Sequence, residues 1–107
     1  MKIVILSSFK KAFKPLSKKY KSIDVDFEKL LNSLEENAFQ GVSIGKDCYK
    51  VRMSIAAKRK GKSGGARVIT CVKIINETIY LLTIYDKSEQ ENINDNELDQ
   101  LLKQAGL

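Results

Sequence analysis

Lysine and arginine are the residues of this chain with the clearest capacity for chemistry, and they gather in one stretch. Residues 46–67 contain eight of them against one acid, Asp47, so the segment carries +7 while the whole 107-residue chain carries +6. A guanidinium stays charged and pairs with phosphate through two hydrogen bonds, and an ammonium becomes a base where neighbouring cations lower its pKa. The stretch therefore predicts an anion site. For any single lysine or arginine, simple exposure to water is the alternative interpretation.

Two β-strands joined by a charged loop are expected to position these cations. Residues 48–54 form the first strand, residues 57–65 the loop, and the second strand starts at Ala66. Side chains alternate along a strand, so Lys50 and Arg52 project from the same face.

The pairing register of these strands decides which charges meet. We expect Arg52 to lie opposite Arg67 and Cys48 opposite Cys71. Like charges that face each other across two strands are destabilising, and a bound polyanion removes that penalty. The two cysteines lack metal-ligand spacing and are expected to be buried reduced thiols, with a cross-strand disulfide as the alternative.

Composition excludes several classes of site. The chain has no histidine, which excludes Ser-His-Asp and Cys-His catalysis and histidine-based RNA hydrolysis, and no transition-metal site is expected. The net charge of +6 and the pI near 9.3 indicate an acidic partner, such as nucleic acid or an acidic protein segment. The length suits one domain, and no run has the length of a transmembrane helix or signal peptide, so we expect a cytoplasmic protein.

The elements that hold the charged strands follow from hydrophobic periodicity. Residues 2–7 form a strand, residues 9–20 carry an apolar helical stripe that Pro15 should kink or divide, and a second helix follows Ser22. We expect a loop at residues 37–47, a central strand at 78–85 and a short acidic helix after Asn94. The order β-α-α-β-β-β-α predicts an α+β domain, in which a helical hairpin packs on a mostly antiparallel four-stranded sheet with all helices on one side.

Three segments, in their order and spacing with the helical hairpin, resemble a known family: Cys48-Tyr49-Lys50-Val51-Arg52, Gly65-Ala66-Arg67-Val68-Ile69 and Tyr80-Leu81-Leu82-Thr83-Ile84-Tyr85-Asp86-Lys87. Over nearly its whole length the chain resembles the RelE/ParE superfamily of type II toxin–antitoxin modules. The resemblance implies a single RelE-like toxin domain over residues 1–107. RelE-like members are ribosome-dependent endoribonucleases that cut mRNA in the decoding site, ParE-like members poison DNA gyrase, and a cognate antitoxin neutralises either type.

The resemblance also assigns site residues. The basic positions on the RelE central strands match Lys50, Arg52 and Arg67, and the basic position after the last strand matches Lys87. RelE places a catalytic tyrosine shortly after that residue, whereas this chain has Glu91-Asn92-Ile93 there, and its nearest tyrosine is Tyr85. The loop at residues 56–64 is also longer than the connection in RelE.

These residue types can support RNA cleavage by the 2′-hydroxyl. Arg52 and Arg67 suit stabilisation of the phosphorane. Lys50, beside Arg52, is the best candidate base, and Lys87 or Arg67 could stabilise or protonate the leaving oxygen. Tyr85 is a further acid–base candidate, and a strand-end tyrosine half packed in the core is its alternative interpretation.

A site made of cations alone does not bend RNA into line, so the resemblance implies that the ribosome supplies orientation. We then expect salt-sensitive contacts to rRNA phosphates from the loop and the first helix, through Lys58, Arg59, Lys60, Lys62, Lys10, Lys11 and Lys14. The expected enzyme is independent of metal ions, needs no cofactor and does not bind a membrane. A ParE-like gyrase inhibitor and a non-catalytic basic module that binds nucleic acid or an antitoxin are the alternatives.

Overall fold

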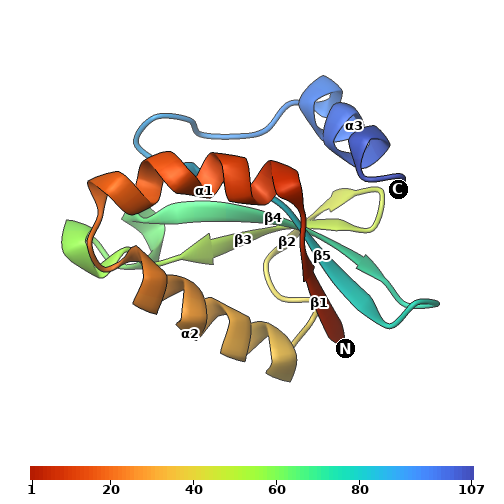
Figure 1. Ribbon diagram of the computed structural model, residues 1–107, viewed down its shortest axis with the longest axis horizontal. Helices are drawn as coiled ribbons and strands as arrows, with labels where there is room; N and C mark the ends of the chain where they lie inside the picture. Colours follow the sequence, from red (N-terminus) through yellow and green to blue (C-terminus); the bar gives the residue numbers. More distant parts are fainter.

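Three α-helices and five β-strands make up the chain, which a computed structural model describes over residues 1–107 (Figure 1). The helices are α1 (Ser7–Lys19), α2 (Ile23–Glu36) and α3 (Asp95–Gln104). The strands are β1 (Lys2–Ile5), β2 (Val42–Gly45), β3 (Cys48–Met53), β4 (Ala66–Lys73) and β5 (Thr78–Asp86). Two short 3-10 turns, η1 (Ala56–Lys58) and η2 (Lys62–Gly64), lie between β3 and β4.

The strands form one sheet in the order β1-β5-β4-β3-β2, in which only β1 and β5 run parallel. The predicted α+β class, the mostly antiparallel sheet and the central position of β5 are confirmed. The count of four strands is wrong, because β2 forms in the segment that was expected to be a loop. Its turn to β3 consists of Lys46 (φ 57°) and Asp47 (φ 64°), the left-handed geometry of a two-residue hairpin.

The predicted register of β3 and β4 is confirmed: Arg52 lies opposite Arg67, and Cys48 opposite Cys71. One rung beyond Cys71, the Val72 N–H donates to the Asp47 carbonyl (2.9 Å), which makes those two residues a hydrogen-bonded pair. Hydrogen-bonded and non-hydrogen-bonded pairs alternate along an antiparallel ladder. The cysteine pair and the arginine pair are therefore of the non-hydrogen-bonded kind, whose side chains lie closer together.

The two faces of the sheet carry separate apolar cores. One face packs against α1 and α2 around Phe9, Leu34 and Val68, and the other packs against α3 around Leu82 and Leu98. The prediction that all helices share one side is therefore wrong for α3. Figure 1 shows α1 and α2 along the sheet, with α3 at the end of a long connection and near the N-terminal end of α1, with which it lines a common pocket.

The predicted helical hairpin is confirmed in α1 and α2. Its two helices are joined by a ring cluster of Phe9, Phe13 and Phe27, with centroids 5.1–5.8 Å apart. The predicted division of the first helix is wrong, because α1 runs without interruption through Pro15. Packing of the apolar stripe against the sheet offsets the hydrogen bond that the proline cannot donate.

A β-bulge in β5 changes which side chains face the charged strands. Ile69 pairs with Thr83 but Thr70 pairs with Leu81, so Leu82 is the extra residue. A bulge shifts the alternation of the strand beyond it by one residue. As a result Tyr85 lies directly opposite Arg67 and on the same face of the sheet.

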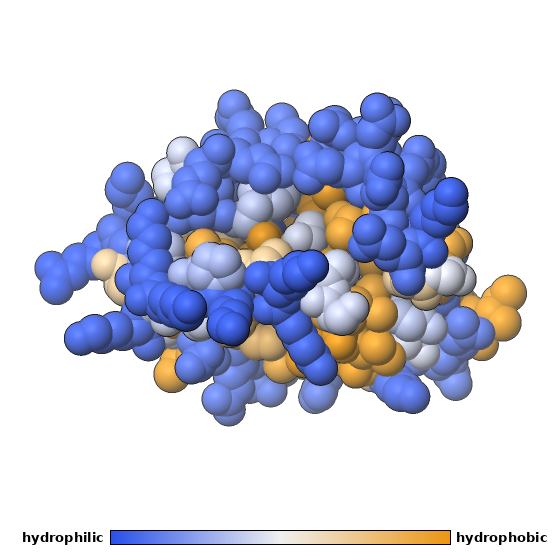
Figure 2. Space-filling model, turned by 45° about the horizontal axis from the view of Figure 1, so that its top comes forward, coloured by the Kyte–Doolittle hydropathy of each residue, from blue (hydrophilic) through white to orange (hydrophobic).

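The surface in Figure 2 is largely hydrophilic, and hydrophobic atoms project at its right edge, the side on which the β4–β5 hairpin lies in Figure 1. Two isoleucines of that hairpin turn, Ile74 and Ile75, are strongly exposed. None of the three helices has the length and apolar character needed to cross a membrane.

Candidate active site

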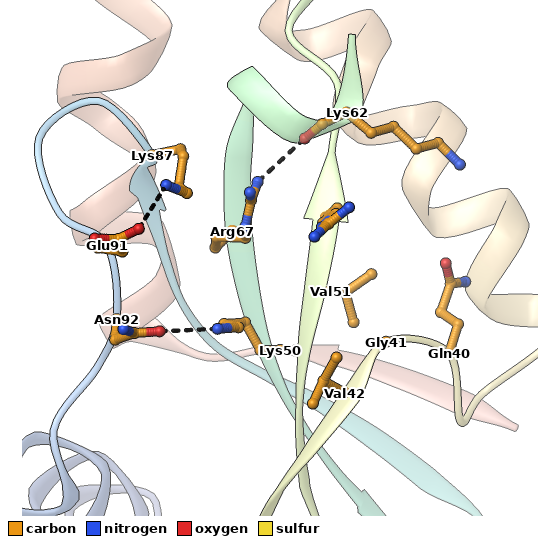
Figure 3. Close-up of a pocket in the computed structure, with 11 residues that line it drawn as sticks. Gln40, Gly41, Val42, Lys50, Val51, Lys62, Arg67, Lys87, Glu91 and Asn92 are labelled. Carbon is orange, nitrogen blue, oxygen red and sulfur yellow. Dashed lines mark hydrogen bonds and ion pairs between the residues drawn. The ribbon is translucent and has the colours of Figure 1, made fainter.

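Cations from the central strands and the loops around them converge on one cavity of about 380 Å³ (Figure 3). Pairing of β2 with β3 stops at Lys50, so the edge of β3 beyond it stays open beside Arg52. The cavity is lined by Gln40, Gly41, Val42, Lys50, Val51, Arg52, Lys62, Arg67, Lys87, Glu91 and Asn92. All four of the basic residues predicted for catalysis are among them.

The two basic residues of β3 differ in their contacts. Lys50 is half-buried, and its ammonium donates to the side-chain oxygen of Asn92 (2.9 Å). Arg52 is exposed and takes part in no ion pair, although it lies opposite another arginine. Unpaired like charges at a close cross-strand pair are the condition under which a bound anion stabilises the protein most.

Arg67 is only 3% exposed and holds the loop that follows η1. Its guanidinium donates to the carbonyl oxygens of Ser63 (2.9 Å), Ala66 (3.0 Å) and Lys62 (3.1 Å). Burial lowers the pKa of Arg67, and the positive charge of Arg52 lowers it further. Three of the five N–H donors of the guanidinium are used in this way, which leaves two without a protein acceptor. Arg67 therefore both fixes the loop and presents charge to an anion.

The segment after β5 supplies Lys87 and the one carboxylate of the cavity. The ammonium of Lys87 lies 3.2 Å from Oε1 of Glu91. The backbone N–H of Lys87 donates to the carbonyl oxygen of Gly65 (3.1 Å). Sequence reasoning assigned no role to Glu91 and Asn92, and it missed Gln40. The available sequence signal for Glu91 was its spacing of four residues from Lys87, because oppositely charged residues four apart can form an ion pair in a tight turn.

Tyr85 is not brought into the cavity. It is 8% exposed, it packs in the core beneath α3, and its hydroxyl is buried without a hydrogen-bond partner. Burial raises the pKa of Tyr85; the charge of Arg67 opposes that shift, and Glu97 adds to it. A tyrosine with a raised pKa is a poor general base at neutral pH.

The charged loop is fixed at its first half. The ammonium of Lys58 lies 2.7 Å from Asp86, and the two side chains are 8% and 0% exposed. Asp86 also accepts from the hydroxyl of Tyr20 (2.5 Å) and from the N–H and hydroxyl of Ser88. Burial alone would raise the pKa of Asp86, but Lys58, Tyr20 and Ser88 hold it well below its ordinary value. Lys58 thus has a structural partner and is not presented to solvent.

The other lysines and arginine that were predicted to bind RNA fall into two groups. Arg59, Lys60 and Lys62 are exposed, and Lys62 lines the cavity. The second group lies on α1, which covers the opposite face of the sheet from the cavity, and comprises Lys10, Lys11 and Lys14. The structure therefore does not bring the α1 lysines together with the catalytic candidates.

Comparisons with known proteins bear on this geometry. The family model described as "RelE toxin of RelE / RelB toxin-antitoxin system" matches residues 6–107. Among solved structures, the chain is similar to a free-state mutant of E. coli toxin RelE in which two arginines are replaced by alanine. The identity is 14%, the match covers 96% of this chain and 95% of that chain, and the TM-score is 0.61. At this identity the structural likeness shows a shared fold.

Proposed function

The chain belongs to the RelE toxin family, and from this premise we propose that it is a toxin that cleaves messenger RNA in the decoding site of the ribosome and so stops translation. Family membership implies a RelB-type antitoxin as partner. The observation that carries the proposal is the single cavity that Lys50, Arg52, Arg67 and Lys87 share.

Stabilisation of the phosphorane is the step that the arginines support best. Arg52 and Arg67 form a close cross-strand pair, and the loop carbonyls hold the guanidinium of Arg67 in place before substrate arrives. Charge that is already fixed at the reacting phosphate needs no reorganisation during the reaction. The pair therefore neutralises negative charge as it accumulates on the non-bridging oxygens.

Proton transfer completes the reaction. A base removes the 2′-hydroxyl proton, the 2′-oxygen attacks phosphorus, and the bond from phosphorus to the 5′-oxygen breaks to leave a 2′,3′-cyclic phosphate and a 5′-hydroxyl. We assign the base to Lys50 or to Glu91, which face the same cavity. Lys87 stabilises or protonates the leaving 5′-oxygen. The buried hydroxyl of Tyr85 makes that residue the least suited of the catalytic candidates.

The ribosome supplies what this cavity lacks. Nothing in a set of cations aligns the attacking oxygen, the phosphorus and the leaving oxygen, and a ribosome that holds the mRNA does so. The exposed loop residues Arg59 and Lys60, together with the lysines of α1, then bind rRNA phosphates. Such contacts weaken steeply as salt rises.

Cleavage on programmed ribosomes tests the proposal. Primer extension should map new mRNA ends in the A site with the wild-type protein, and Arg52→Ala should reduce their yield by about 100-fold. Lys103→Ala, which removes an exposed lysine of α3 outside the cavity, is the matched control. Intact mRNA and undiminished translation with the wild-type protein refute the proposal, and a supercoiling assay with purified gyrase then tests the ParE-like alternative.

A further inference from the structure

A second cavity adjoins the candidate active site. It has a volume of about 230 Å³ and lies between α2 and the end of β3, and we call it the α2 groove. Its lining residues are Asp26, Lys29, Leu30, Ser33, Gln40, Arg52, Met53, Ser54, Ala56 and Lys62. Three of them, Gln40, Arg52 and Lys62, also line the first cavity, so the two cavities are neighbours.

Unpaired positive charge borders the α2 groove. Lys29 is an exposed residue of α2, and Lys29, Arg52 and Lys62 take part in none of the ion pairs of the protein. The one carboxylate of the groove, Asp26, is 5% exposed. Its Oδ2 accepts from the Ser22 hydroxyl (2.8 Å) and from the backbone N–H of Ala56 (3.1 Å). Asp26 therefore serves to hold the loop, and the three cations remain available to an anion.

Lys62 connects the two cavities. Its carbonyl oxygen accepts from Arg67, while its side chain extends across β3 toward α2 (Figure 3). The same residue thus belongs to the framework of the first cavity and carries its charge into the second. A chain of phosphates that passes from the first cavity to the second therefore passes Lys62, and Lys29 also lines the second cavity.

Gln40 stands where the two cavities meet. Its Nε2 donates to Ser33 Oγ (3.0 Å) and to the Asn37 carbonyl (3.4 Å), so the amide orientation is fixed by an acceptor. The side-chain oxygen of Gln40 is left to accept a hydrogen bond. A ribose 2′-hydroxyl can donate one, and DNA has no such group.

We propose that the α2 groove binds the sugar–phosphate backbone of the nucleotide next to the scissile phosphate. The inference rests on the proposed function, because it takes single-stranded RNA as the ligand. Lys29 and Lys62 hold the flanking phosphate, and Gln40 accepts from the flanking ribose. No aromatic residue lines the groove, so it offers no surface for base stacking and binds backbone without regard to sequence.

The proposed role of the groove is tested by measuring the affinity for a short single-stranded RNA. Fluorescence anisotropy reports the binding at each concentration of a salt series. Cleavage is proposed to need the ribosome, so an unmodified oligonucleotide stays intact during the measurement. Lys29→Ala and Lys62→Ala should each flatten the slope of log K against log salt by about 0.7, the value for one phosphate contact on a single strand. Gln40→Ala should remove the preference for RNA over DNA of the same sequence.

Lys103→Ala is the control for Lys29→Ala, since each removes an exposed lysine from a helix. A slope for Lys29→Ala equal to that of Lys103→Ala overturns the inference. It is also overturned if Lys29→Ala weakens only the complex with the antitoxin. If the wild-type protein cleaves mRNA normally in the A site and either result is obtained, the role of the α2 groove in binding RNA is refuted. The proposed function then still stands. Absence of A-site cleavage by the wild-type protein refutes the proposed function, and with it the groove as a substrate subsite.

Discussion

Replacing Lys58 by methionine should destabilise the protein far more than the same replacement at Lys60, an exposed lysine of the charged loop. The ammonium of Lys58 compensates a carboxylate, Asp86, whose side chain is fully buried, at a distance of 2.7 Å. Methionine keeps most of the aliphatic length of lysine but removes the charge. The variant therefore leaves a buried carboxylate without its cation, which is among the costliest defects that a substitution can create.

The structure sets the size of this effect. Removal of one partner of a buried ion pair costs about 3–5 kcal/mol. Asp86 keeps three donors in the variant, namely the hydroxyl of Tyr20 and the N–H and hydroxyl of Ser88, so we expect the lower end of that range. A loss of about 3 kcal/mol lowers the Tm of a domain of this size by roughly 10–25 °C. Lys60→Met, at an exposed position of the same loop, should change stability by less than about 0.5 kcal/mol.

The effect should depend on pH in one direction. The pKa of Asp86 in the folded protein lies below its unfolded value, so its contribution to stability is present above about pH 4 and is lost as pH falls through the folded pKa. Without Lys58 the pKa of this carboxyl rises from its wild-type value, because burial is then opposed only by the donors of Tyr20 and Ser88, so the variant protonates Asp86 at a higher pH than the wild type does. The difference in stability between wild type and Lys58→Met should therefore be full at pH 7 and should narrow as acidification protonates Asp86 in the variant, at a higher pH than in the wild type.

Urea unfolding followed by circular dichroism, at pH 7 and through the acid range, measures these quantities. The double variant Lys58→Met/Asp86→Asn should recover much of the stability, because it removes the uncompensated charge. An Lys58→Met protein as stable as Lys60→Met at pH 7, or a difference that grows toward acid pH, would show that this ion pair does not hold the loop.

The remaining predictions concern the cavity and the thiols. Arg67→Ala should lower A-site cleavage by about 100- to 1000-fold and also loosen the loop, whereas Arg67→Lys should restore part of the charge but not the loop contacts; kinetics and limited proteolysis separate the two effects. Glu91→Gln should tighten RNA binding by removing a negative charge, and a fall in kcat of about 100-fold or more with loss of the acid limb of the pH profile would assign the base to Glu91. Cys48 and Cys71 are 0% exposed, and the neighbouring Cys71 thiol together with burial raises the pKa of the Cys48 thiol. Both thiols should therefore resist alkylation in the native protein and react only on unfolding; rapid labelling in native buffer contradicts that burial.

The local sequence pattern was sufficient to predict those structural features that depend on one short segment or one hairpin. The face of β3 that carries Lys50 and Arg52 could be predicted because these cations alternate with the apolar residues Val51 and Met53. The Asn94 cap of α3 is equally local, since its side chain accepts from the N–H of Glu97 three residues away (2.8 Å). The bulge at Leu82 gave no such signal, because it inserts a residue into a uniformly apolar strand.

Strand β2 shows where a local pattern was present but too weak. Its four residues alternate only briefly, and its turn to β3 uses Lys46 and Asp47 in place of the Asn-Gly or Asp-Gly pair that marks such hairpins. Gly41 precedes it because a Cβ there would lie 2.4 Å from the carbonyl oxygen of Lys50. That close approach is a property of the assembled sheet, and the glycine alone could equally have marked a loop.

The sequence by itself determined which residues carry charge, which helices and strands they occupy, and which cations face one another across β3 and β4. Only the tertiary structure decided which of those charges are available. It buried Lys58 against Asp86, enclosed Tyr85 beneath α3, and brought Glu91 and Lys29 to two neighbouring cavities. The physical reason is that burial and partnership depend on segments far apart in the chain that meet only when the sheet closes, whereas strand pairing and capping depend on neighbours along the chain.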